Sequence, residues 1–181
     1  MNEMKSMLID KAREFAQSAH DSIHHRRKYT DEPYWVHPQR VAAMVASETD
    51  NEAVIAAAWM HDVLEDVAPS NAHFNEDRIK KEFGQTVLDL VLEVTDVSRP
   101  EDGNRLMRKA IDRKHLAQAS NHGKLIKLAD MIDNVIDIDK HDPGFAKVFR
   151  REVSIDLEHL RSGSEALYLR LVALLVGKPQ Q

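Results

Sequence analysis

The chain has 181 residues, no cysteine and a formal net charge of -5 at pH 7. This length suits one packed domain, whereas the negative charge argues against a broad nucleic-acid-binding surface. Because disulfides and thiolate catalysis are excluded, any bound metal must have nitrogen and oxygen ligands.

Helical spacing of apolar residues begins near the N-terminus and continues to residue 60. The first stripe runs from Leu8 to Ala19, and a second one follows Pro38. A third helix begins near Asp50, whose carboxylate is expected to cap it, and runs through Met60 into the acidic residues that follow. Because this third segment is nearly all apolar, we expect it to be buried.

The second half of the sequence repeats this helical pattern, and no convincing strand alternation appears. A short helix is expected before Gly84, and a long one after Pro143. The other helices are expected over residues 86–94, 106–119, 124–138 and 166–176. The sequence therefore predicts an all-α fold, with residues 1–181 forming a single compact bundle of about eight to ten helices.

No apolar run approaches the length that spans a bilayer, and the polar N-terminus lacks a signal-peptide profile. We therefore expect a cytoplasmic protein with neither a membrane nor a nucleic-acid partner. Apolar residues on the last helices would be buried either inside the bundle or in a homodimer, and the sequence leaves both alternatives open.

The third helix ends in a cluster of polar side chains: His61, Asp62, Glu65 and Asp66. Spacings of four residues place these side chains in one broad wedge of a helix. Burying such a wedge is costly unless a cation compensates the carboxylates, so the cluster indicates a divalent ion.

The dipeptide His-Asp alone is weak evidence, because it occurs three times in this chain. His20-Asp21 closes a polar helix end, so we expect capping or solvated side chains there. His141-Asp142 precedes Pro143, and Asp142 is expected to cap the following helix. Only the pair at residues 61 and 62 is followed by two further acids.

A metal site needs more ligands, and His37 and Asp130 interrupt apolar patterns elsewhere in the chain. Taken alone, His37 is interpreted as a helix-start residue bonded to backbone, and Asp130 as the ion-pair partner of Lys127. Taken with His61 and Asp62, they complete a set of two imidazoles and two carboxylates. Such a set leaves coordination positions for water and substrate, which suits hydrolysis.

Two acidic and several basic residues indicate what such a site would do. Glu65 and Asp66 lie one helical turn beyond the ligands, where they can orient a water and accept its proton. Their alternative interpretation, a solvated helix C-terminus, is unfavourable because negative charge opposes the helix dipole there. Guanidinium and ammonium groups suit a phosphorylated substrate. The candidates form two cationic clusters, His24-His25-Arg26-Arg27-Lys28 and the set Arg99, Arg105, Arg108, Lys109 and Arg113, and among them Arg27 and Lys28 stand out.

These motifs resemble the HD-type metal phosphohydrolases, and within them the alarmone-hydrolase domain of the RelA/SpoT homologues. The resemblance spans about residues 8–160, with motifs in that family's order and approximate spacing. The matching segments are Arg27-Lys28, Pro33-Tyr34-Trp35-Val36-His37-Pro38, His61-Asp62-Val63-Leu64-Glu65-Asp66, Phe83-Gly84, Val94-Thr95-Asp96 and Lys127-Leu128-Ala129-Asp130. The chain is therefore similar to a stand-alone small alarmone hydrolase.

The resemblance implies manganese-dependent removal of pyrophosphate from the ribose 3′ position of (p)ppGpp or (p)ppApp, the nucleotides of the stringent response. The other products would be GDP or GTP, or the adenine equivalents. Carried over to this chain, the metal ligands are His37, His61, Asp62 and Asp130, and Glu65 and Asp66 position the water. Arg27, Lys28 and Asn134 match residues around base and ribose, and Arg105, Arg108 and Lys127 are assigned to phosphate contacts.

Departures from the family pattern leave other functions open. Many relatives have Lys and Leu after the metal Asp, where this chain has Met131 and Ile132, and Asp133 precedes Asn134. The base of the nucleotide is therefore not determined. One alternative is a general HD-type nucleotide phosphohydrolase, either a 5′-nucleotidase or an NADPH phosphatase, and another is a catalytically inactive nucleotide-sensing module.

Overall fold

The computed structural model describes residues 2–177, with side chains from residue 7 onward. Within these residues the chain is helical almost throughout, and the only strand-like pairing is an isolated bridge between Arg26 and Pro33. The residues form two compact groups, one ending at Thr95 and one beginning at Asp96. We call them the N-terminal and C-terminal units. The all-α prediction is confirmed, whereas a single domain stays a prediction.

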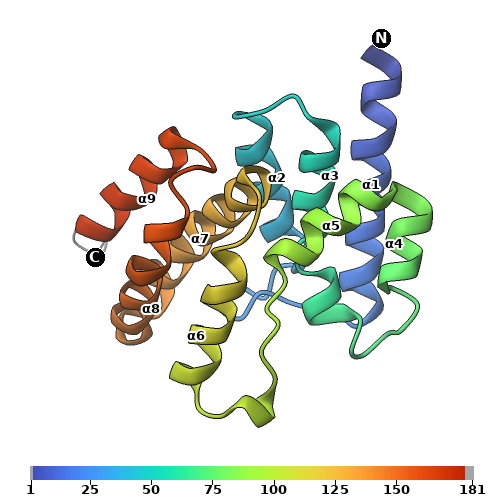
Figure 1. Ribbon diagram of the computed structural model, residues 1–181. Coiled ribbons are helices and arrows are strands. Elements are labelled where there is room, and N and C mark those ends of the chain that lie inside the picture. The colour runs from blue at the N-terminus through green and yellow to red at the C-terminus, as the bar shows by residue number, and fades with distance from the viewer. Residues whose placement is uncertain (1, 178–181) are drawn as a thin grey trace. The chain divides into compact units, whose positions relative to one another are not determined.

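The N-terminal unit is organised around a central apolar helix (Figure 1). Its helices are α1 (Asn2–Ser22), α2 (Val36–Ala46), α3 (Glu52–Met60), α4 (Glu76–Phe83) and α5 (Gln85–Val94). Helix α3 packs against α1, α2 and α5, and every residue from Val54 to Met60 is buried. Contact on three sides explains why this segment has no polar face.

Local capping chemistry sets the ends of these helices. The cap expected at Asp50 is wrong by one residue, because Asn51 accepts the hydrogen bond from the Ala53 amide at 3.1 Å. Asp and Asn are about equally good caps, so the sequence does not choose between neighbours. Helix α4 ends as expected at Gly84, whose φ of 89° is accessible to glycine with little strain.

The C-terminal unit consists of four helices that follow the polar segment after Thr95. They are α6 (Arg105–Leu116), α7 (Asn121–His141), α8 (Pro143–Asp156) and α9 (Glu165–Val176), with 3₁₀ turns at Pro100–Asp102 and Leu157–His159. Helix α7 packs against α8 and α9. Asp142 caps α8 through the Phe145 amide at 3.1 Å, as predicted.

The last helix is only partly buried. On α9, which packs against α7, Leu167 and Leu171 are buried, whereas Leu169 and Val176 are exposed. The apolar residues of α9 are therefore divided between the core and the surface, and a homodimer stays one of the two alternatives that the sequence leaves open. Among residues 2–177, none of the helices combines the length and apolar character that crossing a bilayer requires.

Candidate metal centre and catalytic site

Three of the four predicted metal ligands meet in the N-terminal unit. His37 is the second residue of α2, and His61 and Asp62 directly follow α3. The candidate ligand atoms of these residues all lie within 4.8 Å of one another. The Nε2 atoms of His61 and His37 are 3.1 and 3.5 Å from Oδ2 of Asp62. Packing of α2 against α3 thus brings together residues that are 24 positions apart.

The tautomer of His61 suits metal binding. Its Nδ1 lies 2.9 Å from the backbone oxygen of Ala58. A carbonyl oxygen can only accept a hydrogen bond, so Nδ1 carries a proton, and in the neutral imidazole this leaves the lone pair of Nε2 available to a metal. Metal-bound histidines commonly have this arrangement. Two buried imidazoles and one carboxylate therefore fit a divalent cation that takes nitrogen and oxygen ligands.

Asp130, the fourth predicted ligand, lies on α7 in the C-terminal unit, so its place beside the histidines stays a prediction. Its side chain is buried. Lys127 forms an ion pair with Asp130 Oδ2 at 2.9 Å, and Asn134 donates to Oδ1 at 2.6 Å. The sequence offered two interpretations of Asp130, an ion-pair partner of Lys127 and a metal ligand. Its surroundings are compatible with both, because one carboxylate can fill both roles.

The acidic pair lies on a π-turn rather than on an extension of α3. Helix α3 ends at Met60, and residues Val63–Val67 form one wider turn, in which the Ala68 amide bonds to the Val63 oxygen at 3.0 Å. Such turns are frequent at functional sites. Glu65 is exposed and Asp66 is half-buried, so the two acids have different environments although they are neighbours.

Asp66 has the environment of a proton acceptor at neutral pH. Burial, followed by the charges of Asp62 and Glu65, raises its pKa from 3.8 to about 7, and the nearby Tyr34 hydroxyl and the charge of His61 act in the opposite direction. A carboxyl group with a pKa near the working pH is suited to general acid–base catalysis. This environment depends on tertiary packing and could not be deduced from the sequence.

His20 was assigned from the sequence to a capping or solvated position, and that assignment is wrong. The side chain is fully buried, and burial lowers its pKa to about 3. Its Nδ1 lies 3.1 Å from Nδ1 of His25. A signal was available, since residue 20 continues the face that Ala12, Ala16 and Ala19 bury.

Two of the predicted substrate-binding residues lie in the N-terminal unit. Arg27 is buried, with its guanidinium 5.6 Å from the centre of the Tyr34 ring. Lys28 is exposed, and its Nζ lies 3.3 Å from the Tyr29 hydroxyl. Arg27 is therefore held close to the residues that precede His37, whereas Lys28 extends into solvent. Their substrate contacts stay predictions.

The predicted phosphate-binding residues of the C-terminal unit lie among acidic side chains. Arg105 donates two hydrogen bonds of 2.7 Å to Glu152 and covers the Phe145 ring. Within the described residues, the buried Nε of Arg108 has no hydrogen-bond partner. Since Arg105 already forms a bidentate pair with Glu152, Arg108 is the better placed of the two to bind a phosphate group.

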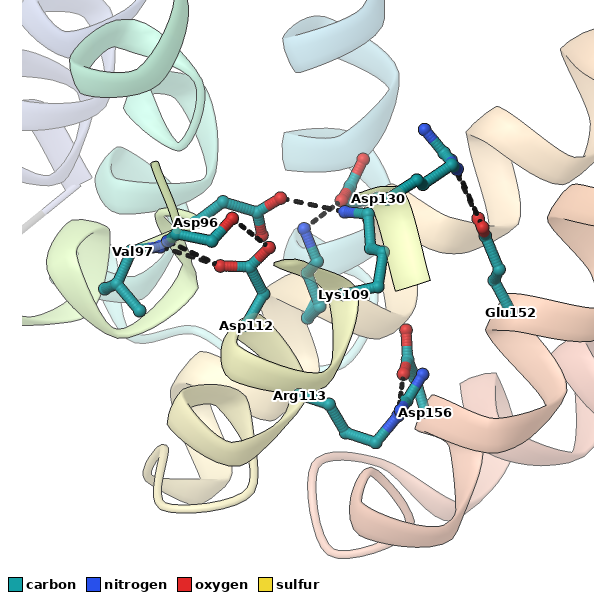
Figure 2. Close-up of polar contacts among 11 residues, drawn as sticks. Asp96, Val97, Lys109, Asp112, Arg113, Asp130, Glu152 and Asp156 are labelled. Carbon is teal, nitrogen blue, oxygen red and sulfur yellow. Dashed lines mark hydrogen bonds and ion pairs between the residues drawn. The ribbon is translucent and has the colours of Figure 1, made fainter. Parts of the chain in front are cut away.

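Acidic residues also organise the polar segment before α6 (Figure 2). Asp112 accepts from the amides of Val97 and Ser98 at 3.0 and 2.8 Å. Lys109 pairs with Asp96 at 2.8 Å, so both side chains attach residues 96–98 to α6. Asp112 could not be recognised from the sequence, because a single acid in a basic helix has no distinctive spacing.

Comparison with known proteins decides the family. The HD-domain model matches residues 12–154. The chain belongs to the HD-domain family. The resemblance predicted from the motifs is thereby confirmed, and the match covers most of both units.

Several relatives of this HD-domain protein have named activities. It is 37% identical over 140 residues to the Xenopus tropicalis guanosine-3′,5′-bis(diphosphate) 3′-pyrophosphohydrolase MESH1, covering 75% of this chain and 72% of that protein. The Drosophila melanogaster MESH1 is 38% identical over 121 residues, which are 65% of this chain and 63% of the relative. The Aquifex aeolicus enzyme of that activity is 34% identical over 70% of this chain but only 17% of its own length.

Solved structures show the same fold. A structure described as a metazoan ortholog of SpoT that hydrolyses ppGpp matches with a TM-score of 0.80 and 28% identity, over 93% of this chain and 94% of the other. A Listeria monocytogenes protein matches with a TM-score of 0.60 at 22% identity, which shows the fold alone. Family, relatives and fold together confirm that this HD-domain protein is a metal-dependent hydrolase.

Proposed function

We propose that this HD-domain protein hydrolyses the 3′-pyrophosphate of guanosine 3′,5′-bis(diphosphate) or of its pentaphosphate and adenosine counterparts. One observation carries the proposal: His37, His61 and Asp62 converge beside a carboxyl group with a raised pKa, in a chain 37% identical to a named 3′-pyrophosphohydrolase. Manganese is the proposed ion. We further propose that the protein works on the free nucleotide in the cytoplasm, without nucleic acid or membrane.

The bound ion would be held by His37, His61, Asp62 and Asp130, and it would supply positive charge that favours attack by water on phosphorus. Asp66 takes the proton from the attacking water, and the neighbouring Glu65 orients that water. The new bond joins the water oxygen to the phosphorus attached to O3′. The bond between this phosphorus and O3′ breaks, O3′ regains a proton, and pyrophosphate is released.

The remaining polar residues bind and orient the substrate in this proposal. Asn134 has a second role, because its hydrogen bond to Asp130 holds that carboxylate in one orientation. Arg27, Lys28 and Asn134 are assigned to base and ribose. Arg105, Arg108 and Lys127 are assigned to the phosphates. Arg108 is preferred over Arg105 because Arg105 is already paired with Glu152, whereas the Nε of Arg108 has no hydrogen-bond partner within the described residues.

The test is to incubate the purified protein and Mn²⁺ separately with guanosine and adenosine 3′,5′-bisdiphosphates, a nucleoside monophosphate and NADPH. Products are separated by ion-exchange chromatography. Release of pyrophosphate from a 3′-pyrophosphorylated nucleotide supports the proposal and identifies the base. Release of phosphate from only the other two compounds refutes it in favour of a general nucleotide phosphohydrolase.

A catalytically inactive sensor is distinguished by a double variant. Glu65→Gln with Asp66→Asn should keep nucleotide binding but lose turnover, because both amides preserve shape and neither accepts a proton readily. Unchanged turnover in this variant would exclude the roles assigned to the acidic pair. Nucleotide binding without turnover in the wild-type protein would identify a sensing module.

A further inference from the structure

The segment between α1 and α2 folds as a small hairpin whose end lies against the metal ligands. The amide of Arg27 donates to the Glu32 oxygen at 2.9 Å, and the amide of Tyr34 donates to the His25 oxygen at 3.1 Å. His24 adopts a positive φ angle of 52° just before the first of these paired residues, and Asp31 adopts one of 57° in the turn between Arg27 and Glu32. The backbone of Tyr34 is therefore tied to that of His25.

The ring of Tyr34 is enclosed by other aromatic side chains. It stacks on the His25 ring at a centroid distance of 3.7 Å and an interplanar angle of 8°. The rings of His20 and His37 lie 4.7 and 5.8 Å away. With the Arg27 guanidinium above it as well, the ring has little freedom to rotate, so the direction of its hydroxyl is set by packing.

That hydroxyl points at a predicted metal ligand. It lies 2.8 Å from Oδ2 of Asp62, the same oxygen that the Nε2 atoms of His61 and His37 approach. An ionised carboxylate can only accept, so the phenol donates its proton to Asp62. A carboxylate oxygen has a second lone pair, which leaves Asp62 able to bind a cation while it accepts this bond.

We propose that Tyr34 is a positioning residue, which holds the Asp62 carboxylate in its metal-binding orientation and is itself held by the stacked ring of His25. The proposal rests on the proposed metal site. Partners behind the ligands of a metal commonly fix ligand orientation, and their loss typically lowers metal affinity about 10- to 100-fold. Nothing in the sequence marked Tyr34 for this role apart from its place three residues before His37.

The decisive variant is Tyr34→Phe, which removes the hydroxyl and keeps the stacked ring. Mn²⁺ is titrated into protein freed of metal with EDTA, and binding is followed by calorimetry. We expect the dissociation constant to rise about tenfold or more, with an unchanged far-UV circular dichroism spectrum. The matched control is Tyr168→Phe on α9, in the C-terminal unit, which also loses one hydroxyl and should bind Mn²⁺ as the wild type does.

Kinetics give a second readout that a purely structural role would not produce. If Tyr34 acts through Asp62, raising the Mn²⁺ concentration should restore most of the kcat of Tyr34→Phe, and KM for the nucleotide at saturating Mn²⁺ should stay near the wild-type value. A raised KM with unchanged Mn²⁺ affinity would overturn the proposal, because the hydroxyl would then contact the substrate. An unchanged dissociation constant for Mn²⁺ would overturn it as well.

A supporting variant addresses the stack. His25→Ala keeps the Tyr34 hydroxyl but removes the ring that stacks on one face of Tyr34, so Mn²⁺ binding should weaken by less than in Tyr34→Phe. Should Tyr34→Phe fail to fold, unchanged Mn²⁺ affinity of His25→Ala overturns the proposal. Absence of Mn²⁺ binding by the folded wild-type protein is a different result, because it refutes the metal site itself and with it the proposed function.

Discussion

Replacing Asp66 with Asn in the metal-free protein is expected to change stability in a pH-dependent way. In the unfolded chain this carboxyl loses its proton near pH 4, whereas in the folded protein its pKa is about 7. Between these values the folded state binds one more proton than the unfolded state. The wild-type free energy of unfolding therefore falls as pH rises through this interval, and the fall ends once pH exceeds the folded pKa.

The size of the effect follows from the pKa shift. One pKa unit corresponds to about 1.4 kcal/mol. Asn does not titrate, so Asp66→Asn should gain stability over the wild type by about 1.4 kcal/mol per pH unit from pH 4 upward. The accumulated gain reaches at most about 4 kcal/mol near pH 7, because the pKa moves from 3.8 to about 7. Above that pH the difference between the two proteins should stay constant.

Urea unfolding in EDTA, followed by circular dichroism from pH 4.5 to 8, measures this difference. All other titrating groups are common to both proteins, so subtraction largely cancels their contributions. Saturating Mn²⁺ should reduce the difference at high pH, since a bound cation stabilises ionised carboxylates. A difference in stability that does not change with pH would refute the buried environment assigned to Asp66, and with it the reason for regarding that residue as the proton acceptor.

Three further variants, two of them with a matched control variant, test other parts of the structure. The wild type should lose stability as pH falls below about 6.5, because burial lowers the folded pKa of His20 to about 3, and His20→Gln should remove this loss. Urea unfolding at a series of pH values measures the free energy of unfolding of both proteins, and an identical pH dependence of the two would contradict the burial of His20. Arg150→Gln should cost about 3 kcal/mol in thermal unfolding, since it removes the 2.6 Å partner of buried Asp139, whereas Arg151→Gln at an exposed site should cost little. Gly163→Ala places a methyl group 2.5 Å from the Leu125 amide nitrogen, and this steric clash should lower stability by about 1–3 kcal/mol. In the control Gly144→Ala the methyl group meets nothing closer than 3.6 Å, so an equal loss of stability there would show that the clash is not the cause.

Features that depend on nearby residues could be predicted from the sequence. Gly84 ends α4, and Asp142 with Pro143 starts α8, because a cap or a stop acts through the backbone within one turn. The uniformly apolar third segment indicated a helix covered on several sides, and α3 is covered in that way. The one displaced cap, Asn51 instead of Asp50, lies where two adjacent residues are equally suited to the position.

Burial was harder to predict where a helix has apolar residues on more than one face. Val148 and Val153 both continue the apolar pattern that follows Pro143, yet Val148 is exposed and Val153 is buried. His20 shows the converse error, since a polar side chain at a helix end was taken to be solvated. Which face of a helix is covered depends on the packing of its neighbours, and the residue type alone does not specify that packing.

The resemblance to the family and the residue types available for a metal site could be recognised from the sequence alone. His37, His61, Asp62 and Asp130 were recognised by their motifs, as were Glu65 and Asp66. The tertiary structure alone decided that the first three converge, that the acidic pair lies on a π-turn, and that the hydroxyl of Tyr34 is directed at Asp62. These features depend on distances between segments remote in sequence and on the removal of water around charged groups, and both arise only when the helices pack.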